Sequence, residues 1–218
     1  MSQFSIYFVR HGQTIFNVFN RMQGWSDSPL TDQGKKTAKQ VGQALAQVDF
    51  AHYYSSDSKR AMDTAQLIKA GAGKADAELT TLPSFREEFY GYYEGDDSSR
   101  TWSLVGKEYG VTSLHELLDH ISIERTKDLM HELDPFHEAE NNQTYWERVN
   151  HGFDYLKAHH DSHEKILIVT HGTTIRSIVS HFGPEFDISQ GPKNGSVTRL
   201  DIDGDQVKVL SYAEELTE

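Results

Sequence analysis

The chain has 218 residues, a size that suits one domain with a full hydrophobic core. Its 37% hydrophobic and 25% charged residues are typical of a globular protein, and its formal net charge of -12 argues against nucleic acid as a partner. No apolar run approaches the roughly 20 residues of a membrane span, and the first one is too short for a secretory signal. Without cysteine there is no disulfide framework and no thiolate nucleophile. We expect a cytoplasmic protein.

The first predicted element is a buried strand over residues 4–9, a short run rich in aromatic and β-branched residues. Arg10, His11 and Gly12 follow it directly. Open α/β sheets bind their ligands at such strand ends. Arginine carries a permanent charge on a planar fork of donors, and histidine has a nitrogen that can attack phosphorus or move a proton. This pair predicts covalent phosphoryl chemistry.

Strands and helices alternate through most of the remaining chain. Further strands are predicted over 50–55 and 165–170, and apolar residues at helical spacing predict helices after Thr31, around 61–68 and around 146–156. This alternation predicts an α/β fold, a three-layer sandwich with a mostly parallel central sheet flanked by helices. Near the C-terminus, residues 197–200 and 207–210 flank Asp203-Gly204, which indicates an antiparallel hairpin at a sheet edge.

Residues 96–143 depart from this alternation. Segments 102–109 and 114–133 have helical patterns with no strand between them. We expect a helical lid inserted into a single domain that spans residues 1–218. Lying over the ligand edge of the sheet, such a lid would select the substrate and exclude water.

Two later segments repeat the order of strand, polar residues and helix. One contains Arg60, near the first turn of its helix, and the other contains His171 and Gly172. Because the carboxyl ends of parallel strands share one edge, Arg10, His11, Arg60 and His171 can converge on a phosphoryl dianion.

Single histidines carry little weight, since the chain has 12 of them and most histidines are surface or capping residues. We predict that His159, His160 and His163, at a polar helix end, are solvated. Arg60 alone would be interpreted as a surface residue. The joint pattern of Arg-His-Gly and Thr-His-Gly, each between a strand and a helix, indicates a phosphate site.

Taken together, these motifs resemble those of the histidine phosphatase superfamily, the phosphoglycerate mutase-like group, over nearly the whole chain. Arg10-His11-Gly12-Gln13-Thr14 with Asn17 is similar to the nucleophile motif, and Gln23-Gly24, Pro29-Leu30-Thr31 and Gly34 to its continuation. Ser55-Ser56 through Arg60-Ala61, with Thr64-Ala65, resembles the second-arginine motif. Phe85-Arg86-Glu87, with Gly91 and Glu94-Gly95, resembles the acid motif, and Val169-Thr170-His171-Gly172 the second-histidine motif.

The resemblance implies a role for each matching residue. His11 would attack phosphorus and become phosphohistidine, and Glu87 would protonate the leaving alkoxide and then activate water. Arg10, Arg60 and His171 would bind the equatorial oxygens of the transferring group. Donors from Asn17, Gln23, Gly24 and the backbone at Gly172 would complete the substrate site.

Glu87 and Glu88 compete for the acid role. The family spacing, with a glycine four positions after the glutamate, selects Glu87 and Gly91. Glu88 would then lie at the surface or behind Glu87.

Hydrolysis is favoured over transfer to a second hydroxyl. The resemblance implies that mutases have a lysine after the acid, and paired arginines with a proline run in the lid. Here Glu94-Gly95-Asp96-Asp97 is acidic, and the lid has only the separated cations Arg100, Lys107, Arg125 and Lys127. The aromatic residues Phe89, Tyr90, Tyr92, Tyr93 and Trp102 either line a pocket for an organic leaving group or pack the lid onto the sheet.

Three alternatives to a phosphatase are considered. One is a cofactor-dependent mutase, and another is a phospho-ligand binding module without catalysis. The third is a metal-dependent hydrolase that uses His11, His171 and Glu87, although two arginines would repel the cation. The prediction is therefore an enzyme with no metal and no cofactor, acting on a small phosphorylated substrate. No motif specifies the natural substrate or an oligomeric state.

Overall fold

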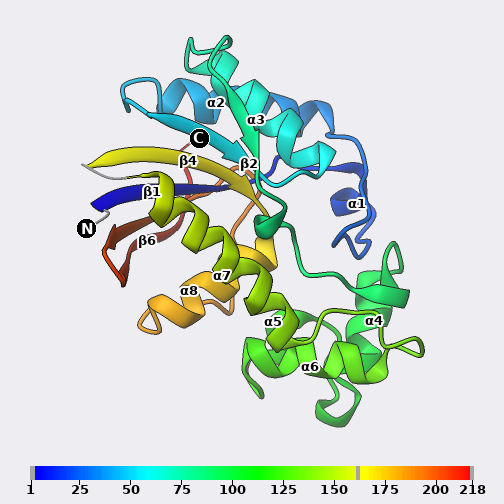
Figure 1. Cartoon of the computed structure of the whole chain (residues 1–218). Coiled ribbons are helices and arrows are strands. Elements are labelled where there is room, and N and C mark those ends of the chain that lie inside the picture. The colour runs from blue at the N-terminus through cyan, green and yellow to red at the C-terminus, as the bar shows by residue number, and fades with distance from the viewer. Residues whose placement is uncertain (1–2, 161–162, 217–218) are drawn as a thin grey trace.

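A mixed six-stranded sheet forms the centre of the molecule in the computed structural model, which describes residues 3–160 and 163–216 (Figure 1). Its strands lie in the order β3-β2-β4-β1-β5-β6. The first four are parallel, whereas β5 and β6 run antiparallel to their neighbours. This arrangement confirms the predicted fold class, including the hairpin. The strands are β1 (Gln3–Arg10), β2 (His52–Ser55), β3 (Leu79–Thr81), β4 (Glu164–Thr170), β5 (Val197–Asp203) and β6 (Gln206–Glu214).

Helices cover both faces of the sheet (Figure 1). Along β4, Ile166 and Ile168 point into one apolar cluster, and Leu167 and Val169 point into the other. All four side chains are fully buried, as expected for a strand covered on both faces. One layer consists of α2 (Asp32–Ala44) and α3 (Lys59–Gly71), and the other of α7 (Asn142–His159) and α8 (Gly172–Phe182).

Side-chain caps fix where the helices begin after each strand. The hydroxyl of Thr31 accepts a hydrogen bond from Gly34 N at 3.0 Å, as predicted, and Ser58 caps α3 in the same way. The short helix α1 (Ile15–Val18) begins at Thr14 with a capping box. These caps start the helices beside the carboxyl ends of β1 and β2.

A separate group of helices lies beyond the carboxyl ends of the parallel strands (Figure 1). It contains α4 (Ser98–Val105), α5 (Leu114–Leu117) and α6 (Ile123–Leu133), with the 3-10 turns η2 (Gly91–Tyr93) and η3 (Lys107–Tyr109). Another 3-10 turn, η1 (Pro83–Phe85), precedes the acid motif. This lid has its own apolar cluster, which includes Met22, Tyr90, Tyr93, Trp102, Val105, Leu117, Met130 and Ala139. The helical insertion expected from the sequence is therefore present.

Two sequence interpretations need correction. The short edge strand β3 was not predicted, because its three residues, two half-exposed and one exposed, give no periodicity. His160 is 3% exposed, so the prediction that it is solvated was wrong, whereas His159 and His163 are exposed. After α7 ends, the chain turns the His160 ring inward against Phe4. Within the described residues, no helix is both long and apolar enough to cross a bilayer.

Candidate active site

A cavity of about 450 Å³ lies between the carboxyl edge of the sheet and the lid. Its floor comes from the ends of β1, the acid segment and the start of α8, and its roof from α1, α4 and the segment before α5. Six of the nine predicted site residues line it: Arg10, His11, Asn17, Gln23, Glu87 and Gly172. The lid contributes Ser98, Ser99, Trp102, Thr112, Ser113 and Leu114. Uncharged side chains of the lid therefore face charged side chains of the sheet edge.

His11 is held as a neutral ring with one free nitrogen. Its Nδ1 lies 2.8 Å from Gly12 O, and because a carbonyl only accepts, Nδ1 carries the proton. Burial, with the nearby charges of Arg60 and Arg10, lowers the pKa of His11 well below its usual value of 6.5. The ring is therefore unprotonated at Nε2 near neutral pH, which is the form that can attack phosphorus.

Arg10 is fixed beside His11 by backbone contacts. Its Nη1 donates to Pro192 O at 2.6 Å, and its Nε is buried without a protein partner. The guanidinium packs on Gly172, where an added Cβ would lie 3.3 Å from Nε. Burial lowers the pKa of Arg10, yet an arginine stays charged near neutral pH.

Glu87 is held by the start of α8. Its Oε2 accepts from Thr173 N at 2.9 Å, and its Oε1 accepts from Thr174 N at 2.9 Å and from Thr174 Oγ1 at 3.1 Å. These donors at the start of α8 fix the carboxyl group in one orientation at the cavity wall. Glu87 is the only acidic side chain among the described residues that line the cavity.

Arg60 and His171 lie behind this floor, next to His11. The rings of His11 and His171 have centroids 5.3 Å apart. Arg60 donates from Nη2 to Gly24 O at 2.7 Å and to His171 Nδ1 at 3.0 Å, and from Nη1 to Ser26 O at 2.8 Å. Because Nδ1 accepts from an arginine, neutral His171 has its proton on Nε2, which lies 2.7 Å from Ser56 Oγ. Arg60 thus fixes the loop at Gly24 through hydrogen bonds to its carbonyl groups. His171 and Gly24 line a smaller cavity next to the first.

The amides of Asn17 and Gln23 are oriented by hydrogen bonds. The Asn17 oxygen accepts from Thr14 N at 3.1 Å and from Asn194 Nδ2 at 3.2 Å, which leaves its NH₂ group as a donor. The Gln23 oxygen accepts from Thr14 Oγ1 at 2.7 Å. Both side chains can therefore present N–H groups to an anion in the cavity.

Glu88 lies away from the cavity, in the interior between the acid segment and the lid. It is 1% exposed, and neither carboxyl oxygen has a hydrogen-bond partner among the described residues. Burial raises the pKa of Glu88 to about 8, since the charge of Lys127 on α6 offsets only part of the effect of desolvation. Lys127 is itself buried, with Nζ 4.7 Å from the centroid of the Tyr145 ring.

Several residues that line the cavity were not predicted from the sequence, and Arg176 is the most informative of them. It lies on α8 one turn after Gly172, is 8% exposed, and has an Nε without a protein partner. Helical spacing from Gly172 and Thr173 is the signal that could have found it. Arg21 and Tyr90 also line the cavity. None of the three arginines, Arg10, Arg21 and Arg176, forms an ion pair with a described residue, so the cavity is strongly positive in an acidic protein.

Of the aromatic residues near the acid segment, some line the cavity and others pack within the lid, which are the two roles predicted for them. Tyr90 and Trp102 line the cavity, and they also belong to the apolar cluster of the lid. Tyr93 packs only in that cluster, and Tyr92 is exposed. Phe89 packs against Trp25 with the two rings tilted and their centroids 4.8 Å apart.

The fold and the strand-end motifs define a class of phosphoryl-transfer proteins. The sequence profile of the histidine phosphatase superfamily (branch 1) matches residues 6–215, and the chain belongs to this family. A phosphoglycerate mutase-like protein 4 of Arabidopsis thaliana is 32% identical over 92% of this chain and 81% of its own length. A 2,3-bisphosphoglycerate-dependent phosphoglycerate mutase 2 of Gloeobacter violaceus is 28% identical over 81% of this chain and 76% of its own length.

Solved structures give the same fold. The phosphoglycerate mutase from Bacillus anthracis has a TM-score of 0.90 and 32% identity, covering 98% of this chain and 94% of its own. A mycobacterial glucosyl-3-phosphoglycerate phosphatase has a TM-score of 0.71 at 20% identity, covering 96% of this chain and 98% of its own. Proteins named as mutases and as phosphatases therefore share this architecture.

Proposed function

We propose that this chain hydrolyses phosphomonoesters through a phosphohistidine on His11. The observation that carries the proposal is the arrangement of His11, whose Nδ1 donates to Gly12 O and whose Nε2 lone pair is free in a cavity shared with Arg10 and Glu87. Nε2 attacks phosphorus as the ester P–O bond breaks, and protonated Glu87 gives its proton to the leaving alkoxide. Water then attacks phosphorus, Glu87 takes a proton from that water, and the P–N bond breaks to release phosphate and restore neutral His11.

The charges around the cavity support this chemistry. Arg10 offers donors to the transferring group, and the NH₂ group of Asn17 adds a neutral donor. Arg60 acts from behind the floor, where its hydrogen bonds to Gly24 O and to neutral His171 position the Gly24 loop, and its charge adds to burial in keeping His11 neutral. Neutral His11 is required at the first step because a protonated ring has no lone pair at Nε2.

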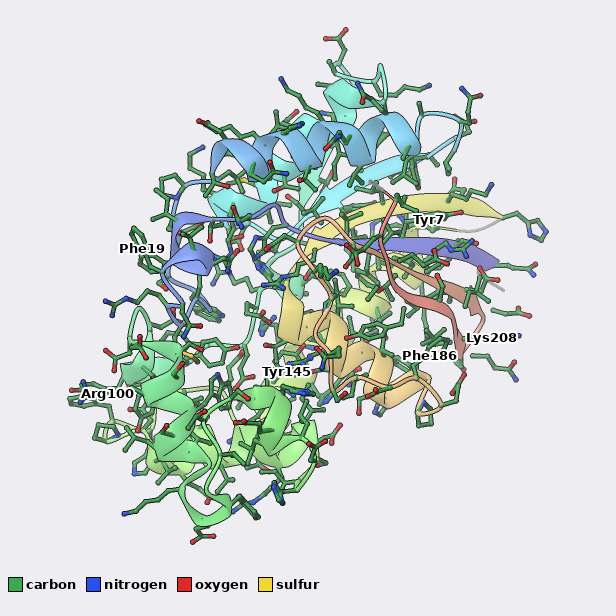
Figure 2. The ribbon with its side chains drawn as sticks, turned by 180° about the vertical axis from the view of Figure 1, so that it is seen from behind. Tyr7, Phe19, Arg100, Tyr145, Phe186 and Lys208 are labelled. Atoms are coloured by element: carbon green, nitrogen blue, oxygen red, sulfur yellow. The ribbon has the colours of Figure 1, made fainter. Side chains whose placement is uncertain are left out.

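Hydrolysis rather than transfer is supported by the lid. Of its basic residues, Arg100 and Lys107 are exposed, Arg125 pairs with Glu132 at 2.5 Å, and Lys127 is buried near Glu88. Figure 2 shows Arg100 at the outer side of the lid. None of these four described cations lines the cavity, so the lid offers no charge to retain a released phosphorylated intermediate.

A mutase is the second candidate, favoured by the names of the relatives that are about 30% identical to this chain. One experiment separates the two. The protein is incubated with phosphoglycerates and a panel of other phosphorylated metabolites in EDTA, and both released phosphate and isomerised product are measured. We expect phosphate release without isomerisation, and an acid-labile phosphoryl group on His11. Isomerisation faster than phosphate release would establish the mutase, and activity that requires added metal would exclude the phosphohistidine mechanism.

The substrate class follows from the arginines that the phosphoryl group leaves unused. Arg21 and Arg176 line the same cavity as Arg10 and have no acidic partner among the described residues. Arg176 is buried and Arg21 is exposed, and arginines recognise carboxylates and phosphates through charge-assisted hydrogen bonds. We infer a substrate that has a second anionic group besides the phosphoryl group that is transferred.

A further inference from the structure

A second cluster of reactive side chains lies at the amino edge of the sheet, opposite the candidate active site. His52 begins β2, Glu164 begins β4, and His160 follows the last residue of α7. His171 follows the carboxyl end of β4, and His11 follows that of the neighbouring parallel strand β1, so the length of the sheet separates the two clusters (Figure 1). The three side chains can each supply one ligand atom, and these atoms lie within 4.8 Å of one another.

His160 is the fixed centre of this cluster. Its side chain is 1% exposed, with Nδ1 2.8 Å from Glu164 Oε2 and Nε2 2.8 Å from Tyr54 Oη. Since a carboxylate only accepts, Nδ1 carries the proton of the neutral ring, and Tyr54 donates to Nε2.

His52 adds a further nitrogen ligand that this hydrogen-bond network does not use. Its exposed ring lies edge-on to the His160 ring, with centroids 4.9 Å apart, and stacks on Tyr54 at 6.1 Å. Glu164 is about one-third exposed, which leaves one side of the cluster open to solvent. The result is two imidazoles and one carboxylate around an open position.

We propose that His52, His160 and Glu164 form a Zn²⁺ site with water as the fourth ligand. Imidazole and carboxylate are ordinary Zn²⁺ ligands, and bonds of about 2.0–2.2 Å place tetrahedral ligand atoms roughly 3.4 Å apart. His160 Nδ1 and Glu164 Oε2 lie 2.8 Å apart, so binding requires these two atoms to separate by about 0.6 Å and the exposed His52 ring to rotate toward them. The tethering of β2 to β4 and the end of α7 would stabilise the amino edge of the sheet.

Tyr54 allows His160 to bind the ion without a change in its charge. The ion takes the place of the Nδ1 proton, which moves to Nε2 through solvent, and Nε2–H then donates to the Tyr54 oxygen. A hydroxyl can accept as well as donate, so the contact that orients the ring survives the exchange. A hydrogen bond of this kind on the second nitrogen of a ligating histidine strengthens metal binding by about 10- to 100-fold.

The test is calorimetric titration of tag-free, EDTA-treated and dialysed protein with Zn²⁺. We expect one tight site per chain, a rise in the thermal midpoint with Zn²⁺, and a tetrahedral visible spectrum when Co²⁺ replaces Zn²⁺. His52→Ala and Glu164→Gln should each weaken binding at least about tenfold, and Tyr54→Phe about tenfold. His151→Ala, which changes an exposed histidine on α7, is the matched control and should bind like the wild type.

The outcomes separate this site from other histidines. Absence of saturable 1:1 binding, or unchanged affinity in both His52→Ala and Glu164→Gln, would overturn the proposal. Retained phosphatase activity in Glu164→Gln, with Zn²⁺ affinity lost, would place the ion away from the catalytic cavity, as expected. Loss of Zn²⁺ binding in His11→Ala instead would assign the ion to the cavity and refute the site at the amino edge.

Discussion

The floor and the lid of the cavity differ in how their charges are held. On the floor, His11, Arg10 and Glu87 are each fixed by backbone groups: Gly12 O, Pro192 O and the N–H groups that begin α8. In the lid, the residues that line the cavity are uncharged, and the cations face solvent or the interior.

We interpret this difference as a division of roles, in which the floor supports the reaction and the lid selects the substrate. Backbone contacts at strand and helix ends keep the floor groups in place without substrate, which is what a transition state with shifting charge requires. The lid offers hydroxyls and a tryptophan, which can adapt to the leaving group. Substitutions of His11, Arg10 or Glu87 should therefore change the rate for every substrate, and substitutions elsewhere should act selectively or through stability.

Loss of the nucleophile should have the largest effect. His11→Ala should lower kcat by at least about 10⁴-fold for all phosphomonoesters, because no other floor group can accept the phosphoryl group. Phosphate release in EDTA is the measurement, and acid-labile labelling of the protein should disappear with it. A His11→Ala protein with normal turnover would contradict the role of the floor.

Glu87→Gln should follow, with a fall in kcat of about 10²–10⁴-fold that is steepest for poor leaving groups, which need a proton. Glu88→Gln is the matched control, since Glu88 has the same charge but does not line the cavity. Its effect on kcat should stay below about tenfold. A larger fall in kcat for Glu88→Gln than for Glu87→Gln would show that Glu88, not Glu87, is the general acid.

Arg176→Met should act selectively. A charge-assisted hydrogen bond of about 1.5–3 kcal/mol corresponds to a loss of about 10- to 100-fold in kcat/KM for substrates with a second anionic group. Phenyl phosphate, which lacks that group, should be affected far less. Arg176→Lys retains the charge without the fork, and Arg100→Met is an exposed control. Equal losses on both kinds of substrate would show that Arg176 supports the loop at Ser189 instead of binding substrate.

The smallest effect concerns stability and its pH dependence. The pKa of Glu88 is raised from 4.5 to about 8 by burial, so the folded state holds a proton that the unfolded state releases. The free energy of unfolding should therefore fall, relative to Glu88→Gln, as the pH rises from about 4.5 to about 8, by about 2 kcal/mol or more. Urea unfolding at pH 5 and pH 9 measures this difference. Parallel behaviour of both proteins would mean that Lys127 compensates the buried carboxylate.

Much of the sheet edge that lines the candidate active site could be predicted from local sequence. Arg10, His11 and Gly172 each lie at a junction between an apolar strand and a helix, and a parallel sheet brings such junctions to one edge. Arg176 was missed because its role depends on which face of α8 meets the cavity. His160 was interpreted as solvated because its neighbours are polar, whereas the sheet edge that buries it is formed by Phe4 and Tyr54, far away in the sequence.

The sequence by itself determined the fold class and the family, and it predicted which strand ends form the candidate active site, because short patterns of apolar and reactive residues encode strand ends. Only the tertiary structure decided the state of each group. Gly12 O selects the free nitrogen of His11, carbonyl groups hold Arg60, and the lid buries Glu88 beside Lys127. Desolvation and hydrogen bonding depend on residues that are distant along the chain, so no local pattern can report them.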